Sequence, residues 1–184
     1  MPRAWATVCL LALLAALTGC GGDAEVKLKV VSGSMEPGIR PGDTVTLDQS
    51  AYDHAAPRVG DVVVVHPAKG IDALRCASAG IDAGAPCARA IPGSVPQEIV
   101  TRIVAGPGDR IAFRHGRVIR DGQAVREPYA RRCTQEVCEL PRAIRVARGH
   151  WFVAGDNRGA AADSRVWGPV PTDQILGRVK GPSP

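Results

Sequence analysis

Serine, arginine and aspartate residues gather in a few glycine-containing blocks of this 184-residue chain. The first block, SGSMEP, runs from Ser32 to Pro37 and carries two hydroxyl groups. A serine hydroxyl can attack a carbonyl carbon if a base takes its proton and if nearby donors stabilise the oxyanion that forms. Serine and glycine also favour turns through their backbone chemistry alone. The block therefore has a structural interpretation beside the catalytic one.

Three further blocks favour the catalytic interpretation. They are GDVVV (60–64), TRIVAGPGD (101–109), and GDNR (155–158) followed by DSR (163–165). In this order and at these spacings, the four blocks resemble the type I signal peptidase family of membrane-bound serine endopeptidases, over roughly 30–179. The resemblance implies an extracytoplasmic, all-β catalytic domain. It also implies cleavage of exported precursors after small residues, at sites of the Ala-x-Ala kind.

The resemblance assigns a role to each matching residue. Ser34 falls on the nucleophile. Ser32 matches a hydroxyl that donates to the oxyanion together with the backbone N–H of Ser34. The last two blocks match residues that frame the active site, namely Asp156, Asn157, Arg158, Asp163, Ser164 and Arg165.

The general base departs from the family pattern. Bacterial members carry a lysine, and eukaryotic and archaeal members a histidine, where this chain has Thr101. A threonine hydroxyl is too weak a base to deprotonate serine, and the neighbouring Arg102 stays protonated. The serine that orients the lysine in bacterial members is here Ala161. We do not expect the base among the chain's other lysines and histidines, which are Lys27, Lys29, Lys69, Lys180, His54, His66, His115 and His150.

Two functions of different classes therefore follow. The first is a membrane-associated serine endopeptidase of the signal peptidase kind with an altered base. The second is a pseudopeptidase that binds extended exported peptides along a strand edge without cutting them. A lipoprotein with a purely structural role is a third interpretation, which an occluded Ser34 would favour. The expected partners are exported precursor proteins or their signal peptides.

The elements that would position these residues are short strands. Low aromatic content, 21 glycines and 15 prolines favour many brief strands joined by turns, so we expect an all-β, mainly antiparallel fold with disulfide-stapled loops. The run DVVVV predicts a strand buried on both faces, and Asp121-Gly122 predicts a hairpin turn. The expected strands are 25–31, 43–47, 61–65, 98–104, 110–113 and 117–120.

The N-terminus predicts export. One arginine precedes an apolar run that is too short to span a bilayer, and the run ends in Leu-Thr-Gly-Cys at Cys20. This pattern resembles a bacterial lipoprotein signal, so we expect a signal peptide (1–19), a lipid-anchor linker with the first strand (20–29), the signal-peptidase-like domain (30–180) and a tail (181–184). Cys20 would carry the lipid on the outer face of the cell membrane. The alternative is a segment retained as a single membrane anchor.

Four cysteines remain in the exported part and allow three disulfide pairings. We expect the sequence-local one, Cys76–Cys87 and Cys133–Cys138, because each bond would close one loop. The spacing does not favour zinc, and we expect neither a metal nor an organic cofactor. The net charge of +5 comes from scattered arginines with few aromatics. It favours an anionic membrane surface over nucleic acid, which we do not expect as a partner.

Overall fold

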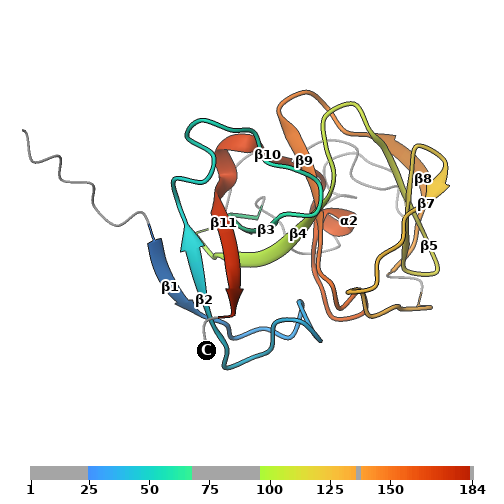
Figure 1. The fold of residues 1–184 in the computed structure, drawn as a ribbon. Helices are drawn as coiled ribbons and strands as arrows, with labels where there is room; N and C mark the ends of the chain where they lie inside the picture. The colour runs from blue at the N-terminus through green and yellow to red at the C-terminus, as the bar shows by residue number, and fades with distance from the viewer. Residues whose placement is uncertain (1–24, 68–95, 136–137, 183–184) are drawn as a thin grey trace, which may run out of the picture.

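A computed structural model describes residues 25–67, 96–135 and 138–182 of the chain. In these ranges the chain forms two antiparallel sheets, and one short helix lies between two strands of the larger sheet (Figure 1). The expected all-β fold is therefore confirmed. The proposed boundary between residues 19 and 20, the site Cys20, and the pair Cys76–Cys87 lie outside the described residues.

The larger sheet has seven strands in the order β1-β2-β11-β3-β4-β9-β10. Every pair of neighbouring strands in it is antiparallel. The strands are β1 (Glu25–Lys29), β2 (Thr44–Asp48), β3 (Val62–Val65), β4 (Ile99–Ala105), β9 (His150–Ala154), β10 (Val170–Pro171) and β11 (Ile175–Pro182).

The smaller sheet has four strands in the order β7-β6-β5-β8. They are β5 (Arg110–Arg114), β6 (Arg117–Arg120), β7 (Gln123–Ala124) and β8 (Leu140–Arg145). Asp121 (φ 52°) and Gly122 (φ 83°) both take positive φ between β6 and β7, which is the expected two-residue hairpin turn. The helix α2 (Ser164–Trp167) and the 3-10 turn η2 (Thr172–Gln174) complete the described elements.

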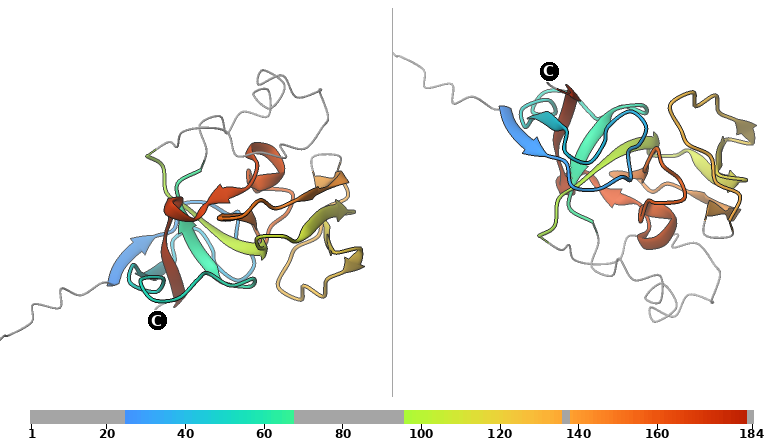
Figure 2. Two further views of the ribbon diagram at one scale, coloured as in Figure 1. Left: turned by 90° about the horizontal axis from the view of Figure 1, so that it is seen from above. Right: turned by 90° about the horizontal axis from the view of Figure 1, so that it is seen from below.

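Strand β3 lies in the middle of the large sheet and is buried on both faces, as its valine run predicts. Val63 and Val65 join an apolar cluster with Trp167 of α2, whereas Val64 faces a second cluster that contains Met35. A third cluster joins the two sheets through Phe113 and Phe152, among others. Figure 2 shows the smaller sheet beside the larger one, with β4 and β9 running toward it.

The strand bounds differ from the expected ones, mostly by one residue, and the ends of the first and last strands differ most. The first strand ends at Lys29, two residues before the expected end, because the chain turns there into the loop that carries Ser34. The last strand reaches Pro182 and so includes two of the four residues expected as a tail. A register shift in β11 lets Pro182 pair with Val45, which keeps this end of the strand in the sheet.

Candidate active site

Ser34 lies on the loop between β1 and β2, and buried neighbours anchor that loop. Met35 is 1% exposed and packs with Ile39 in the cluster below the sheet. The base of the loop is closed by two backbone hydrogen bonds, from Val30 N–H to the Asp43 carbonyl (2.9 Å) and from Gly42 N–H to the Val30 carbonyl (2.8 Å). Ser34 itself is half-buried and lines a cavity. It is not occluded, so the condition that would favour a purely structural role is not met.

The loop that follows β9 holds the Ser34 turn from the other side. The backbone N–H of Asn157 donates to the Ser34 carbonyl (2.9 Å), and its side-chain amide donates to the Gly33 carbonyl (3.0 Å). Gly155 is in contact here as well, because a Cβ on it would meet Ala161 and would lie 2.6 Å from the Ser34 carbonyl oxygen. Ser34, Gly155, Asn157 and Ala161 therefore form one packed unit, although they come from distant blocks of the sequence.

Ser32 lies beside the backbone donor with which it would form an oxyanion site. Its Oγ accepts a hydrogen bond from the Ser34 N–H at 3.2 Å. The two groups are thus close enough to flank a single oxygen atom. A substrate oxyanion placed between them would replace this hydrogen bond.

A groove of about 320 Å³ leads to Ser34. Two chain segments line it, residues 28–32 and residues 97–100, together with Ser34, Met35, Val64, Ala160 and Ala162. The described residues give Val31 no hydrogen bond, and the residue is 88% exposed. An extended peptide in the groove could therefore pair with this backbone.

Thr101 is buried in β4 and is not among the residues that line the groove. It pairs with Val63, and its neighbour Val100 pairs with Val64. Since side chains alternate along a strand, Thr101 points to the opposite face of β4 from the groove residue Val100. Thr101 is 1% exposed, and within the described ranges its hydroxyl has no hydrogen-bond partner.

Among the described residues, no lysine or histidine donates to or accepts from the Ser34 hydroxyl. Lys180 pairs instead with Glu25 and with Asp48 (3.0 Å), and His150 Nδ1 contacts the Arg148 carbonyl. Lys29 lines the groove without a hydrogen bond to Ser34, and Lys69 lies outside the described residues. The described part of the chain therefore places no amine or imidazole in a hydrogen bond with the Ser34 hydroxyl.

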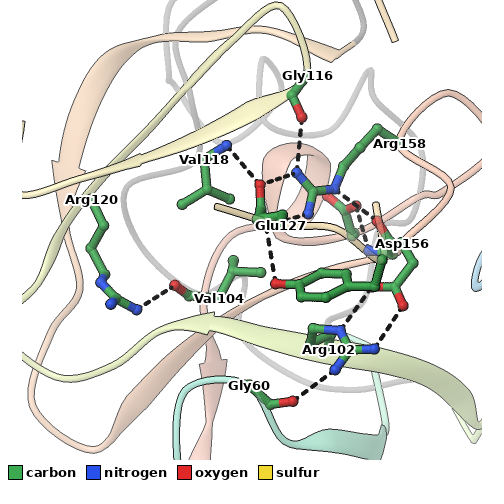
Figure 3. Close-up of polar contacts among 12 residues, drawn as sticks. Gly60, Arg102, Val104, Gly116, Val118, Arg120, Glu127, Asp156 and Arg158 are labelled. Atoms are coloured by element: carbon green, nitrogen blue, oxygen red, sulfur yellow. Dashed lines mark hydrogen bonds and ion pairs between the residues drawn. The ribbon is translucent and has the colours of Figure 1, made fainter. Parts of the chain in front are cut away.

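Arg102 is committed to an ion pair rather than to catalysis. Its guanidinium makes two hydrogen bonds to the Asp156 carboxylate (2.9 and 2.8 Å) and one to the Gly60 carbonyl (Figure 3). Burial lowers the pKa of Arg102, but the hydrogen bonds and the charge of Asp156 outweigh it, so the pKa is raised. Arg102 stays protonated and ties β4 to the loop that holds the Ser34 turn.

Arg158 is fully buried and binds Glu127 on the loop between β7 and β8. The closest nitrogen to oxygen distance is 2.6 Å, and the two side chains are 0% and 5% exposed. Arg158 also donates to the carbonyls of Gly155 and Gly116 (Figure 3). Removing one partner of such a buried pair typically costs about 3–5 kcal/mol.

Sequence reasoning missed Glu127 and also Tyr129, whose ring lies 4.0 Å from the Arg102 guanidinium carbon. Neither residue lies in one of the four blocks, and a buried arginine requires an acidic partner that only the fold identifies.

Asp163 and Arg165 pair with each other at the start of α2. Arg165 donates to both carboxylate oxygens (2.8 and 2.7 Å), and Asp163 also accepts from the Gly155 N–H (3.1 Å). Burial lowers the pKa of Arg165, but the charge of Asp163 and the hydrogen bonds to it raise that pKa overall. Ser164 Oγ accepts from the Val153 N–H (3.0 Å) and joins α2 to β9. These contacts hold residues 155–165 as one folded unit beside Ser34.

The disulfide Cys133–Cys138 is present, as expected. Cys133 lies against Gly116 of the β5–β6 turn, so the bond closes a loop that packs on the small sheet. The ranges that the structure describes hold no group of three or more side chains suited to a metal ion.

The family described as "Signal peptidase, peptidase S26" matches residues 3–183. The chain belongs to the peptidase S26 family of signal peptidases. The resemblance drawn from the four blocks is thereby confirmed. Within this family the chain is 34% identical over 148 residues to a "Probable signal peptidase I-1" of Synechocystis sp. (strain ATCC 27184 / PCC 6803 / Kazusa), which covers 80% of this chain and 65% of that protein.

Other peptidase S26 relatives match the same part of the chain. A "Signal peptidase I" of Bacillus caldolyticus is 30% identical over 162 residues, which cover 82% of this chain and 75% of that protein. A crystal structure of a signal peptidase I from Enterococcus faecalis V583 is 20% identical, with a TM-score of 0.41, over 67% of this chain and 97% of that chain. That structural likeness is too small to support any detail of the site. This chain matches only about two thirds of the length of the Synechocystis relative.

Proposed function

We propose that this signal peptidase family member is a serine endopeptidase that cleaves exported precursor proteins after small residues, with Ser34 as nucleophile. The observation that carries the proposal is that Ser34 lines a groove together with the strand ends 28–29 and 99–100, next to the paired donors Ser34 N–H and Ser32 Oγ. Membership in the family supplies the substrate class.

The proposed reaction begins when Ser34 Oγ loses its proton and bonds to the carbonyl carbon of the scissile peptide. The carbonyl oxygen becomes an oxyanion between the Ser34 N–H and the Ser32 hydroxyl. The carbon–nitrogen bond then breaks, the leaving amine takes up a proton, and water releases the acyl group. One proton acceptor, either a side chain or solvent, has to take the proton from Ser34 and return it to the leaving amine.

Peptide binding without cleavage is the second candidate, and a specific observation favours it. Thr101 occupies the position of the base, points away from the groove residue Val100, and leaves its hydroxyl unpaired within the described ranges. A site that retains the groove and the oxyanion donors but lacks the base would bind extended peptides and release them intact.

One experiment separates the two functions. Wild-type protein and Ser34→Ala are compared on a peptide with an Ala-x-Ala site, with cleavage followed by mass spectrometry and affinity by fluorescence anisotropy. The endopeptidase proposal expects cleavage by wild type alone and binding by both. Binding without cleavage by either protein supports the second candidate. Equal cleavage by both proteins would remove Ser34 from the reaction.

We further propose that the protein is held on the outer face of the cell membrane by a lipid on Cys20, with retention of the apolar N-terminal segment as the alternative. The described residues contain no helix long and apolar enough to cross a membrane. Mass spectrometry of wild type and Cys20→Ser tests this proposal. Loss of a lipid mass and of membrane association in Cys20→Ser is expected, whereas unchanged association would favour the retained segment.

A further inference from the structure

The surface continues beyond Ser34 as a line of arginines. Ala160, which lines the groove, also lines a cavity of about 490 Å³ together with Asn157, Arg131 and Arg132. Arg132 in turn lines a cavity of about 310 Å³ with Arg117 and Arg126. We name Arg117, Arg126, Arg131 and Arg132 the basic trough. It lies next to the groove because neighbouring cavities share a lining residue, first Ala160 and then Arg132.

The basic trough is held in a defined position relative to Ser34. Arg131 forms a parallel β-bridge with Asn157, the residue that holds the Ser34 turn. The Arg131 N–H donates to the Asp156 carbonyl (2.8 Å), and the Arg158 N–H donates to the Arg131 carbonyl (3.2 Å). The loop between β7 and β8, which carries Arg131, is also anchored by the buried ion pair of Glu127 with Arg158 (Figure 3). The arginines therefore project from a fixed backbone.

The charge of the trough is not neutralised by the described part of the chain. Glu127 lines the 310 Å³ cavity, but its carboxylate already binds Arg158 at 2.6 Å. Arg131 makes only a long contact of 3.7 Å with Glu36, in which the two side chains are 66% and 34% exposed. Arg117, Arg126 and Arg132 are exposed and have no ion pair with any described residue. The surface is thus positive next to the proposed cleavage point.

We propose that the basic trough binds acidic side chains of the substrate that follow the scissile bond. This inference rests on the proposed function. With the residues before the bond in the mainly apolar groove, the chain after the bond would pass Ala160, which the groove shares with the arginine-lined cavity. Arginine binds carboxylates through charge and through paired N–H donors. Substrates of this protein accordingly carry aspartate or glutamate within the first several residues of the mature part.

The test uses four labelled peptides and the full-length Ser34→Ala protein, so that affinity is measured without turnover. The peptides combine an Ala-x-Ala or a bulky sequence before the bond with an acidic or a neutral sequence after it. Acidic peptides should bind about three- to tenfold more tightly than neutral ones at low salt, and the difference should shrink as salt is added. Equal affinity for acidic and neutral sequences overturns the inference.

The two proposals fail in different arms of this test. Equal affinity for Ala-x-Ala and bulky sequences counts against the proposed function, whereas the acidic and neutral pair tests the trough. Absence of binding by all four peptides overturns both proposals.

Charge reversals in the basic trough test the inference directly, with a charge reversal elsewhere as the matched control. Arg126→Glu with Arg132→Glu should abolish or reverse the preference for acidic sequences. Arg148→Glu should leave it unchanged, because Arg148 is an exposed arginine that precedes β9, at the opposite end of this strand from Gly155. A preference that survives the double reversal overturns the inference. The inference is also overturned if the double reversal lowers binding to phosphatidylglycerol vesicles but leaves peptide binding unchanged, because the trough would then be a membrane contact.

Discussion

The backbone N–H of Asn157 donates to the carbonyl of Ser34 at 2.9 Å, while the Asn157 side chain binds the neighbouring Gly33 carbonyl. The position of the proposed nucleophile therefore depends on a loop from the last third of the chain. That loop in turn depends on ion pairs at Asp156, Arg158 and Asp163. The residues that frame the site act on Ser34 through the backbone.

We expect Asn157→Ala to weaken the Ser34 turn, because the Gly33 carbonyl loses a donor. The loss of one hydrogen bond should lower the free energy of unfolding by about 1 kcal/mol. Asn157→Asp should cost more, since a carboxylate oxygen would face that carbonyl. Urea unfolding gives the stabilities, and the Ala-x-Ala peptide gives cleavage or affinity, which should fall in the same order. A more stable aspartate variant would contradict the contact.

Gly155→Ala should displace the Ser34 turn, because the added Cβ would lie 2.6 Å from the Ser34 carbonyl oxygen. Overpacking against backbone typically costs about 1–3 kcal/mol. Gly38→Ala on the same turn is the control, since its Cβ would meet only the Met35 carbonyl at 3.9 Å. Thermal unfolding of both variants measures the difference, and equal melting temperatures would show that the close approach is wrong.

Thr101→Val should stabilise the protein. The Thr101 hydroxyl is buried without a partner in the described ranges, and valine has nearly the same shape without the polar atom. Removing an unsatisfied buried hydroxyl should raise the free energy of unfolding by about 1 kcal/mol. Thr172→Val should do the opposite, because that hydroxyl accepts from Trp151 and donates to the Gly149 carbonyl. A destabilised Thr101→Val would mean that the hydroxyl has a partner in the folded protein.

Restoring the family pattern should raise cleavage. Thr101→Lys with Ala161→Ser supplies an amine and its orienting hydroxyl, and burial lowers the pKa of a lysine so that it can accept a proton. General base catalysis contributes roughly 100-fold or more to such reactions. Cleavage of the Ala-x-Ala peptide is the measurement, with the same double substitution in Ser34→Ala as control. A folded double variant with no gain would contradict the assignment of Thr101 to the base position.

Both tyrosines should remain un-ionised in the folded protein near pH 10.5. Burial, followed by the negative charge of Glu127, raises the pKa of Tyr129 to about 12. Burial and the hydrogen bond to Asp61 raise the pKa of Tyr52 further. In urea both should titrate near their usual value of about 10. Phenolate absorbance against pH, with and without urea, tests this, and a native transition near pH 10 would contradict it.

The sign of the linked effect on stability follows from the raised pKa values. The folded state binds the tyrosine protons more tightly than the unfolded state does. Stability from this source is therefore complete below about pH 10 and is lost as the pH rises through the folded pKa values. Tyr129→Phe should reduce the slope of stability against pH in this alkaline range.

The local patterns account for most of the fold. The valine run of β3 predicts burial on both faces because its side chains alternate between two clusters. Asp121-Gly122 predicts its hairpin because the turn needs positive φ at both positions. The strand ends at Lys29 and Pro182 were not predictable, since they depend on the Ser34 loop and on a register shift against β2.

The sequence by itself determined the family and the all-β class, and it predicted the disulfide Cys133–Cys138. Each of these is recorded in residue types and short spacings. Only the tertiary structure decided that Thr101 is buried outside the groove lining, that Glu127 neutralises Arg158, and that four arginines line two cavities next to the groove. These relations join residues far apart in the chain, and they arise from strand pairing and burial, which no local pattern encodes.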